Sequence, residues 1–297
     1  MNPKFSAAKK ADMHLARKVS ELYQPEEIDF GVLVNFDIPR IRTVYRYIQH
    51  HFGNTDRNRK IKTLEIGYHI GLVVESLRVL DGNNRFDFSA TERYTPENWE
   101  IIGQPRCPVD ALDLMDTVGR NQYVEKNRES YDCILLGEVI EHIPSNFLSA
   151  IFNAMYALLV EGGLLIVTTP NLHNLYFRIS HLLGADYDRD AVPNHMGFPH
   201  IHNCSLRKVV DFAHASGLFL TASEYTNFGS GYILAKSNSS FRRFLERLRV
   251  LTLCRLFPSL GDDFIASFTK DKSKSGKTSL IFGQNHMPFI DAFRSRR

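Results

Sequence analysis

The sequence predicts an α/β fold with a doubly wound, mostly parallel sheet, and two observations carry this prediction. Short apolar segments typical of buried strands occur at residues 61–67, 85–93, 131–137 and 163–170. Segments with helical spacing of apolar residues lie between them, and such alternation requires crossover connections between parallel strands. The composition agrees, because 43% hydrophobic and 23% charged residues in a chain of 297 are typical of a globular protein with a substantial core.

The elements of the first half follow in a regular order. Apolar side chains recur at helical spacing within residues 38–52, and Gly53 closes that helix. The strand at 61–67 leads through a glycine turn into a helix at 71–80. A second strand follows at 85–93, and a weaker third strand is expected within residues 107–114.

In the second half, the strand at 131–137 precedes a helix that we expect Ser145 to cap. Gly162 and Gly163 are interpreted as the end of that helix, directly before the strand at 163–170. Ser205 is expected to cap a further helix that ends at Gly217. Three more elements are expected: a strand at 219–225, a helix at 241–257 and a closing strand at 262–270.

This pattern divides the chain into three parts. Residues 1–58 are predicted to be a helical extension, residues 59–271 the main domain, and residues 272–297 a basic linker and tail. Within the main domain, residues 171–204 are predicted to be an insert that acts as a lid. The sequence contains neither an apolar run long enough to span a bilayer nor a secretory signal, so we expect a cytoplasmic protein with four buried thiols.

The charge distribution limits the classes of partner that the chain can bind. The net charge is +3, yet from Lys270 onward seven Lys or Arg stand against two Asp, so the rest of the chain is slightly negative. This balance argues against a broad nucleic-acid surface, whereas the basic tail can touch phosphates or an anionic membrane. The helix at 241–257 has an arginine-rich side and allows two interpretations: peripheral membrane contact, or simple packing on the sheet with a solvated basic face.

A glycine turn follows the first strand, where an open parallel sheet binds its ligands. Glu65 lies near the end of that strand, and Gly67 and Gly71 flank the turn into the next helix. Glycine allows a tight turn and a close approach of backbone amides to a ligand. Glu92 ends the second strand, where a carboxylate can accept both hydroxyl groups of a ribose.

Two further motifs make the chain resemble the class I S-adenosylmethionine-dependent methyltransferases. Residues 131–144 (YDCILLGEVIEHIP) are similar to that family's fourth-strand motif, and residues 161–171 (EGGLLIVTTPN) to its fifth-strand motif. The resemblance covers about residues 60–225 and is closest to the branch of the ubiquinone-pathway O-methyltransferases. It implies a seven-stranded, Rossmann-like methyltransferase fold.

The resemblance also implies a role for each cofactor-binding candidate. Glu65 would organise the loop near the amino group of S-adenosylmethionine, with Gly67 and Gly71 beside its methionine moiety. Glu92 would hold the ribose. Asp110 and Ala111, after the third strand, would lie near the adenine.

The glycine turn departs from the family at two positions. Tyr68 stands where a small residue is usual, and His69 where glycine is usual. Either ring would crowd the methionine end of the cofactor, or would point away from it. The second arrangement is our expectation for His69.

Acidic and histidine residues gather after the fourth strand. Glu138, Glu141 and His142 have i, i+3 and i+4 spacing, so on a short helix they would share one face. His142 and His200 are expected to converge on the acceptor and to take its proton. Glu138, Glu141, His142 and His200 are equally candidates for a site that binds Mg²⁺ or Mn²⁺, as in some relatives, or Glu141 and His142 simply brace the loop.

The expected function is therefore methyl transfer from S-adenosylmethionine to an oxygen of a small molecule or glycan. One alternative is a metal-assisted RNA 2′-O-methyltransferase, against which the absence of basic surplus in the main body counts. The other is a degenerate methyltransferase fold that only binds a partner, for which His69 is the main argument.

Overall fold

The computed structural model describes most of the chain. The described residues are 3–23, 28–53, 59–82, 85–93, 105–182, 200–201, 204–227, 229–230, 239–271 and 273. The basic tail, most of the linker before it and residues 183–199 of the expected lid lie outside this set.

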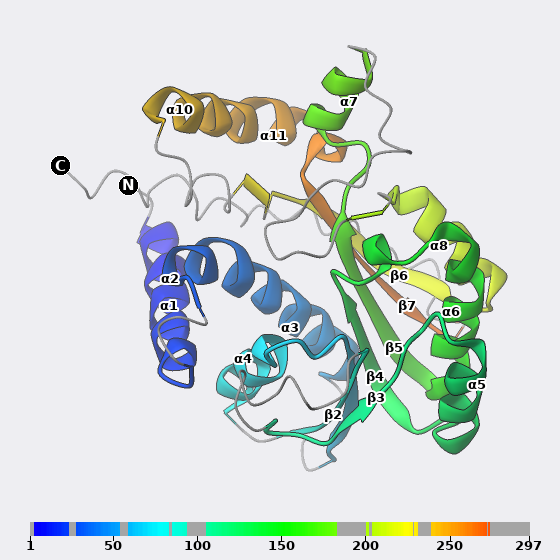
Figure 1. Cartoon of the computed structure of the whole chain (residues 1–297). Coiled ribbons are helices and arrows are strands. Elements are labelled where there is room, and N and C mark those ends of the chain that lie inside the picture. The colour runs from blue at the N-terminus through cyan, green and yellow to red at the C-terminus, as the bar shows by residue number, and fades with distance from the viewer. Residues whose placement is uncertain are drawn as a thin grey trace.

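A seven-stranded sheet forms the centre of the molecule, in the order β3-β2-β1-β4-β5-β7-β6 (Figure 1). Its strands are β1 Ile61–Ile66, β2 Phe86–Glu92, β3 Val109–Ala111, β4 Tyr131–Gly137, β5 Leu159–Pro170, β6 Phe219–Thr226 and β7 Asp263–Thr269. Strands β1 to β5 are parallel, and β7 runs antiparallel to both of its neighbours. This sheet confirms the predicted α/β, doubly wound and mostly parallel fold.

Helices cover both faces of the sheet (Figure 1). One layer contains α5 Thr117–Lys126, α6 Ser145–Leu158 and α8 Leu206–Ala215. The opposite layer contains α3 Ile38–Phe52 and α4 Leu72–Asp81. The side chains of β4 alternate between the two, because successive residues of a strand point to opposite faces. Ile134 and Leu136 join the core under α6, while Cys133 and Leu135 join the core under α3.

The N-terminal segment adds a third cluster of buried side chains. Helix α1 Pro3–Ser20 packs against α3 and α4, and α2 Phe30–Val32 and the π-helical turn η1 Leu33–Asp37 lead into α3. Leu15, Ala16 and Val19 of α1 are buried against Leu33 and Ile38.

Two local expectations about the second half are wrong. Ser145 is the first residue of α6 rather than its cap. The Ser145 Oγ instead accepts a hydrogen bond at 3.1 Å from the Nζ of Lys208 in α8. Gly162 and Gly163 lie inside β5, where the pairing with β4 shifts register and Gly162 has a φ of +71°. Glycine permits this bulge, because a left-handed φ costs it little.

The remaining elements lie at the carboxyl end of the sheet. They are the 3₁₀ turn η3 Ile140–His142, α7 Leu175–Leu182, α10 Ser240–Leu248, the π-helical turn η4 Arg249–Leu253, α11 Cys254–Leu256 and the 3₁₀ turn η5 Pro258–Leu260. Ser205 caps α8 as predicted, because its Oγ accepts from the Lys208 N–H at 3.2 Å. Among the described residues, no helix has the length and apolar character needed to cross a bilayer.

Candidate active site

The carboxyl ends of the parallel strands bring the candidate residues to one edge of the sheet. The pairing of β1 with β2 and β4 aligns Ile66 with Thr91 and Leu136, so these strands end together. Glu65 and Gly67 therefore lie at the same edge as the residues that follow β2 and β4. This edge is where open parallel sheets bind ligands.

The glycine turn after β1 has an unusual packing. Gly67 and Gly71 have φ values of +80° and +73°, a region that glycine enters without strain. A Cβ on Gly71 would lie only 2.3 Å from the Tyr68 Oη, so the tyrosine ring occupies the space that the glycine leaves. Tyr68 is buried in the core cluster with Val74. Its ring is therefore part of the packing under α4.

His69 stands between the two glycines of the same turn. Its side chain is exposed, and its φ of +48° is uncommon for a residue with a Cβ. The His69 backbone N–H donates to the Glu92 Oε2 at 2.8 Å. This bond joins the glycine turn to the end of β2 and helps to hold the left-handed conformation.

Glu92 and its neighbours form the outer part of the edge. The second carboxylate oxygen of Glu92 accepts from the Arg93 N–H at 2.7 Å, and each oxygen keeps a further lone pair for a ligand. Ala111 of β3 pairs with Glu92, and Asp110 pairs with Thr91. The structure thus brings Glu92 and Ala111 together beside the turn, with both Asp110 and Ala111 exposed.

Glu65 is buried beneath the turn with an unsatisfied oxygen. Its Oε2 has no hydrogen-bond partner among the described residues. Burial raises the pKa of Glu65 to about 8, although the nearby Arg40 guanidinium works in the opposite direction. Glu65 and Arg40 line one small pocket together with Gly137 and Thr168.

Sequence reasoning missed Arg40. This residue of α3 is buried, and its guanidinium lies 3.3 Å from the Asp37 Oδ1 and 3.7 Å from the Glu138 Oε1. Burial raises the pKa of Asp37 to about 6, and Arg40 opposes that shift. A signal existed, because Arg40 stands four residues before Val44 on the apolar stripe of the helix.

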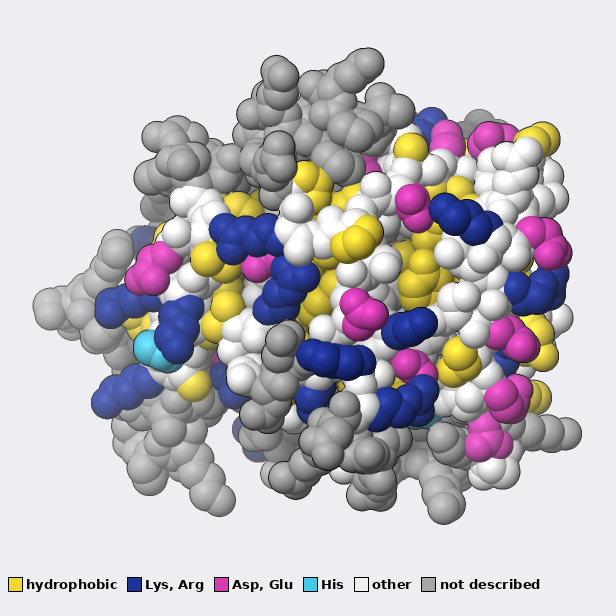
Figure 2. Space-filling view, turned by 90° about the horizontal axis from the view of Figure 1, so that it is seen from below, with side chains coloured by type: hydrophobic (Ala, Val, Ile, Leu, Met, Phe, Trp, Pro, Cys, Tyr) yellow, Lys and Arg dark blue, Asp and Glu magenta, His cyan; other side chains and the backbone are white. Residues whose placement is uncertain are grey.

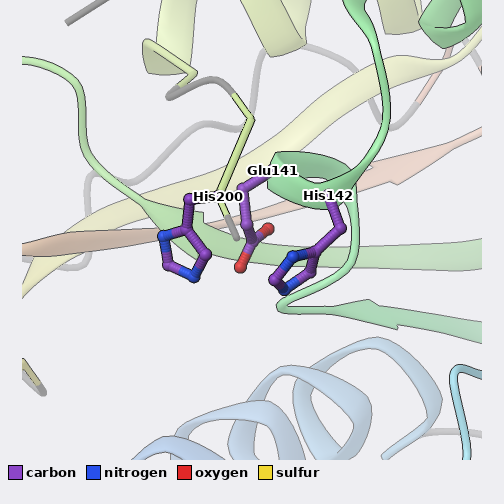
Figure 3. Close-up of side chains that lie close together, drawn as sticks. All are labelled: Glu141, His142 and His200. Atoms are coloured by element: carbon purple, nitrogen blue, oxygen red, sulfur yellow. The ribbon is translucent and has the colours of Figure 1, made fainter. Parts of the chain in front are cut away.

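Three of the four metal candidates come together after β4 (Figure 3). Donor atoms of Glu141, His142 and His200 all lie within 4.8 Å of one another, and the two imidazole centroids are 4.9 Å apart. The Ile201 N–H donates to the Glu141 carbonyl at 3.0 Å and fixes the segment that carries His200.

Glu138 is not part of this cluster of donor atoms, and the expectation that it shares a helical face with Glu141 and His142 is wrong. The short helix begins only at Ile140, and Glu138 precedes it with a φ of +56°. Its Oε1 accepts from the Thr168 Oγ1 at 2.8 Å and faces Arg40.

The Glu141 carboxyl is buried, and only one of its two oxygens has a hydrogen-bond partner among the described residues. Its Oε2 accepts from the Thr169 Oγ1 at 2.9 Å, whereas its Oε1 has no hydrogen-bond partner among the described residues. Burial and the neighbouring Glu138 raise the pKa of Glu141 well above its ordinary value. Burial and His142 lower the pKa of His200, so its imidazole is neutral at physiological pH.

The two ends of the expected lid lie side by side. Asn171, directly after β5, forms a parallel bridge with Cys204, and the Leu172 N–H donates to the Cys204 carbonyl at 3.0 Å. The Asn171 side-chain amide donates to the carbonyls of Ser259 and Gly261 at 2.9 and 2.8 Å. Between these ends the structure describes α7 and residues 200–201, while residues 183–199 and 202–203 lie outside the described part.

One family model and several solved structures are similar to this chain. A family model described as a methyltransferase domain matches residues 40–221. One solved structure, a SAM-dependent methyltransferase from Archaeoglobus fulgidus, is 14% identical with a TM-score of 0.48 and covers 77% of this chain and 94% of its own. Another, an S-adenosylmethionine-dependent methyltransferase from Mesorhizobium loti, is 9% identical with a TM-score of 0.47 and covers 78% and 97%. The search of curated proteins finds no match.

Proposed function

This chain belongs to the family of methyltransferase domains as a class I S-adenosylmethionine-dependent enzyme, and from that premise we propose that it methylates a hydroxyl oxygen of a small molecule or glycan. The observation that carries the proposal is the meeting of His142 and His200 at the carboxyl edge of the sheet. A hydroxyl needs a proton acceptor when its oxygen attacks a methyl group, and imidazole is suited to that role near neutral pH.

The residues of the glycine turn fit the cofactor. The unsatisfied Glu65 Oε2 is a buried acceptor that a cationic amino group would satisfy. The two glycines give the turn its left-handed backbone, and Glu92 presents its free lone pairs beside Ala111. S-adenosylmethionine, when bound, supplies an activated methyl group on a sulfonium, so the protein has mainly to position the acceptor and exclude water.

The histidine pair would handle the acceptor proton. The lowered pKa of His200 keeps its ring uncharged and able to accept a proton from the hydroxyl. His142 lies within reach of the same group, because its ring faces that of His200 (Figure 3). As the acceptor oxygen bonds to the methyl carbon and the methyl–sulfur bond breaks, leaving a neutral thioether, the imidazole would take the hydroxyl proton.

A divalent ion is a second candidate for the same three side chains. The Glu141 Oε1, which has no hydrogen-bond partner among the described residues, and the two imidazoles offer one oxygen and two nitrogen donors. Imidazole donors favour Mn²⁺ over Mg²⁺, because Mg²⁺ prefers oxygen ligands. Such an ion would lower the pKa of a bound hydroxyl and would replace the histidines as the means of removing its proton.

The charge balance favours a small acceptor over RNA. A broad basic surface is the usual electrostatic signature of nucleic-acid binding, whereas Asp and Glu slightly outnumber Lys and Arg before Lys270. On the face in Figure 2, which is seen from below, Lys and Arg side chains are interspersed with Asp, Glu and apolar side chains. We therefore keep the RNA 2′-hydroxyl as an outcome of the experiment below.

Methyl transfer from labelled S-adenosylmethionine to panels of phenols, sugars, amines and short RNA tests this proposal. His142→Gln and His200→Gln should each lower kcat by about 10² to 10⁴ while calorimetry shows unchanged cofactor affinity. His214→Gln, an exposed histidine of α8, is the matched control and should keep full activity.

The remaining outcomes separate the alternatives. Loss of activity with a chelator and its return with Mn²⁺ or Mg²⁺ would assign the three side chains to a metal ion. Labelling of amines alone, or full activity in both histidine variants, would contradict O-methylation by this site.

A further inference from the structure

The segment from Phe241 to Phe257 exposes apolar side chains to solvent and buries charged ones, which is the reverse of an ordinary surface helix. The sequence allowed a helix packed on the sheet through Phe244 and Leu248, with its arginines in solvent, but that interpretation is wrong. Phe244 is 59% exposed and Leu248 is 47% exposed. The buried side of the segment carries a charged pair, Glu246 and Arg249.

A buried ionic cluster fixes this orientation. The Arg249 Nη2 donates to the Glu246 Oε1 and to the Asp262 Oδ1, each at 2.7 Å, and lies close to the Ser230 Oγ. The Arg249 and Glu246 side chains are 5% and 1% exposed. Turning the helix over would separate these charges in a poorly solvated site, which is strongly unfavourable. The buried ionic cluster therefore determines that the apolar side of this segment points outward.

The outward face forms a continuous apolar stripe, which we call the α10–α11 face. Its exposed apolar residues are Phe241, Phe244, Leu245, Leu248, Leu253, Leu256 and Phe257. Ile179 and Leu182 of α7 are also exposed, Leu182 at 83%. The hydrogen bonds from Asn171 to Ser259 and Gly261 tie the start of α7 to the end of α11 (Figure 1).

The α10–α11 face combines this stripe with positive charge. Residues 241–257 contain five Arg and one Glu, and Glu246 is neutralised by Arg249 inside the cluster. Arg242 and Arg255 are exposed, one near each end of the stripe. Scattered apolar residues on a surface need no explanation, but a helical stripe of them bordered by arginines does.

We propose that the α10–α11 face docks on an anionic membrane surface. The apolar side chains would enter the boundary between headgroups and acyl chains, as those of an amphipathic helix lying in the membrane plane do. The arginines would pair with lipid phosphates, for which a guanidinium has matching geometry. A protein partner or a second copy would match the apolar stripe, but the excess of arginine favours anionic headgroups. The proposal does not depend on the identity of the methyl acceptor.

Sedimentation of the full chain with lipid vesicles tests this proposal. Phosphatidylcholine vesicles that contain about one third phosphatidylserine should pellet the protein, and raising the salt concentration should reduce the effect. Phosphatidylcholine alone should pellet much less. Phe244→Ser with Leu248→Ser should weaken binding about 100-fold or more, because two large apolar side chains no longer enter the membrane.

A charge variant and a matched control complete the design. Arg242→Glu with Arg255→Glu should weaken binding to anionic vesicles at least about tenfold. Val118→Ser, at an apolar site of α5 that is 65% exposed, should bind as the unmodified chain does. Circular dichroism verifies the fold of each variant, which the exposed position of every changed side chain should preserve.

Three results would overturn the proposal. The first is an unmodified chain that stays in the supernatant with anionic vesicles, as expected if another segment of this chain covers the face. The second is equal binding of the Phe244 and Leu248 double variant. The third is a dimer in light scattering that the same double variant converts into a monomer, which would assign the face to a second copy.

Discussion

Glu65 and Arg40 are two buried charges that line one small pocket beside the glycine turn. The two do not form an ion pair in the described structure. The carboxyl keeps its proton in the folded protein up to about pH 8, compared with an ordinary pKa of 4.5. This carboxyl ionises more easily in the unfolded chain than in the folded protein. The free energy of unfolding that depends on keeping the proton is therefore lost as the pH rises through 8.

A proton measurement tests the role of Glu65. Binding of S-adenosylmethionine at pH 7 should release a proton from this carboxyl, because a cationic amino group favours its ionised form. Calorimetry in two buffers of different ionisation enthalpy measures that proton. Glu65→Gln should abolish the release and weaken binding by about 1.5 to 3 kcal/mol.

Glu75→Gln is the control for this experiment. Glu75 is a buried glutamate of α4 whose oxygens already face Arg78 at 2.7 Å and Arg106 at 3.5 Å. The Glu75 variant should still release the proton when it binds the cofactor. Equal release from the unmodified chain and from Glu65→Gln would show that another group supplies it.

At the scale of an element, the orientation of α10 depends on one arginine. The Arg249 guanidinium joins Glu246 and Asp262 in a buried site, and burial raises the pKa of the Asp262 carboxyl while Arg249 opposes that shift. Removal of the arginine would leave two buried carboxyl groups without a counter-charge. Such losses are among the most destabilising single changes.

We therefore expect Arg249→Met to lower the free energy of unfolding by about 3 to 5 kcal/mol, as measured by urea denaturation. Arg128→Met removes an exposed arginine that pairs with Glu125 at 2.7 Å, and it should leave the free energy of unfolding nearly unchanged. A similar small cost for both variants would mean that the buried cluster does not hold the helix in place.

The whole molecule raises the question of whether residues 1–58 unfold with the main domain. Helix α1 buries Leu15, Ala16 and Val19 against Leu33 and Ile38, and Asp12 pairs with Arg42 of α3. The predicted division at residue 58 separates these residues from the sheet in sequence, yet α3 also contributes Ile41 and Ile48 to the core beneath it. Shared packing of this kind favours one cooperative unit.

Leu15→Ala tests that cooperativity. It should lower the free energy of unfolding by about 2 to 4 kcal/mol, because it leaves a cavity in a buried cluster. Circular dichroism and amide hydrogen exchange in β4 should report the same loss in a single transition. Val118→Ala, at an exposed site, should change stability by less than about 0.5 kcal/mol. A separate early transition confined to α1 would instead identify an independent extension.

Much of the fold was predictable from the sequence. The alternation of strands and helices, the cap at Ser205 and the turn between Gly67 and Gly71 are all present in the structure. These features depend on a few consecutive residues, because side-chain periodicity and backbone freedom act over short distances. The motif resemblance then supplied the family, which the match over residues 40–221 confirms.

What the sequence alone determined is thus the order and type of the elements, the glycine turn after the first strand and the methyltransferase family. Only the tertiary structure decided that Arg40 lines the pocket, that Glu138 bonds to Thr168 and faces Arg40, and that the α10–α11 face points outward. Each of these depends on partners far away in the chain, as when Asp262 fixes Arg249. A helical pattern shows which side chains share a face, but the direction of that face depends on which charges and cavities the rest of the fold places beside it.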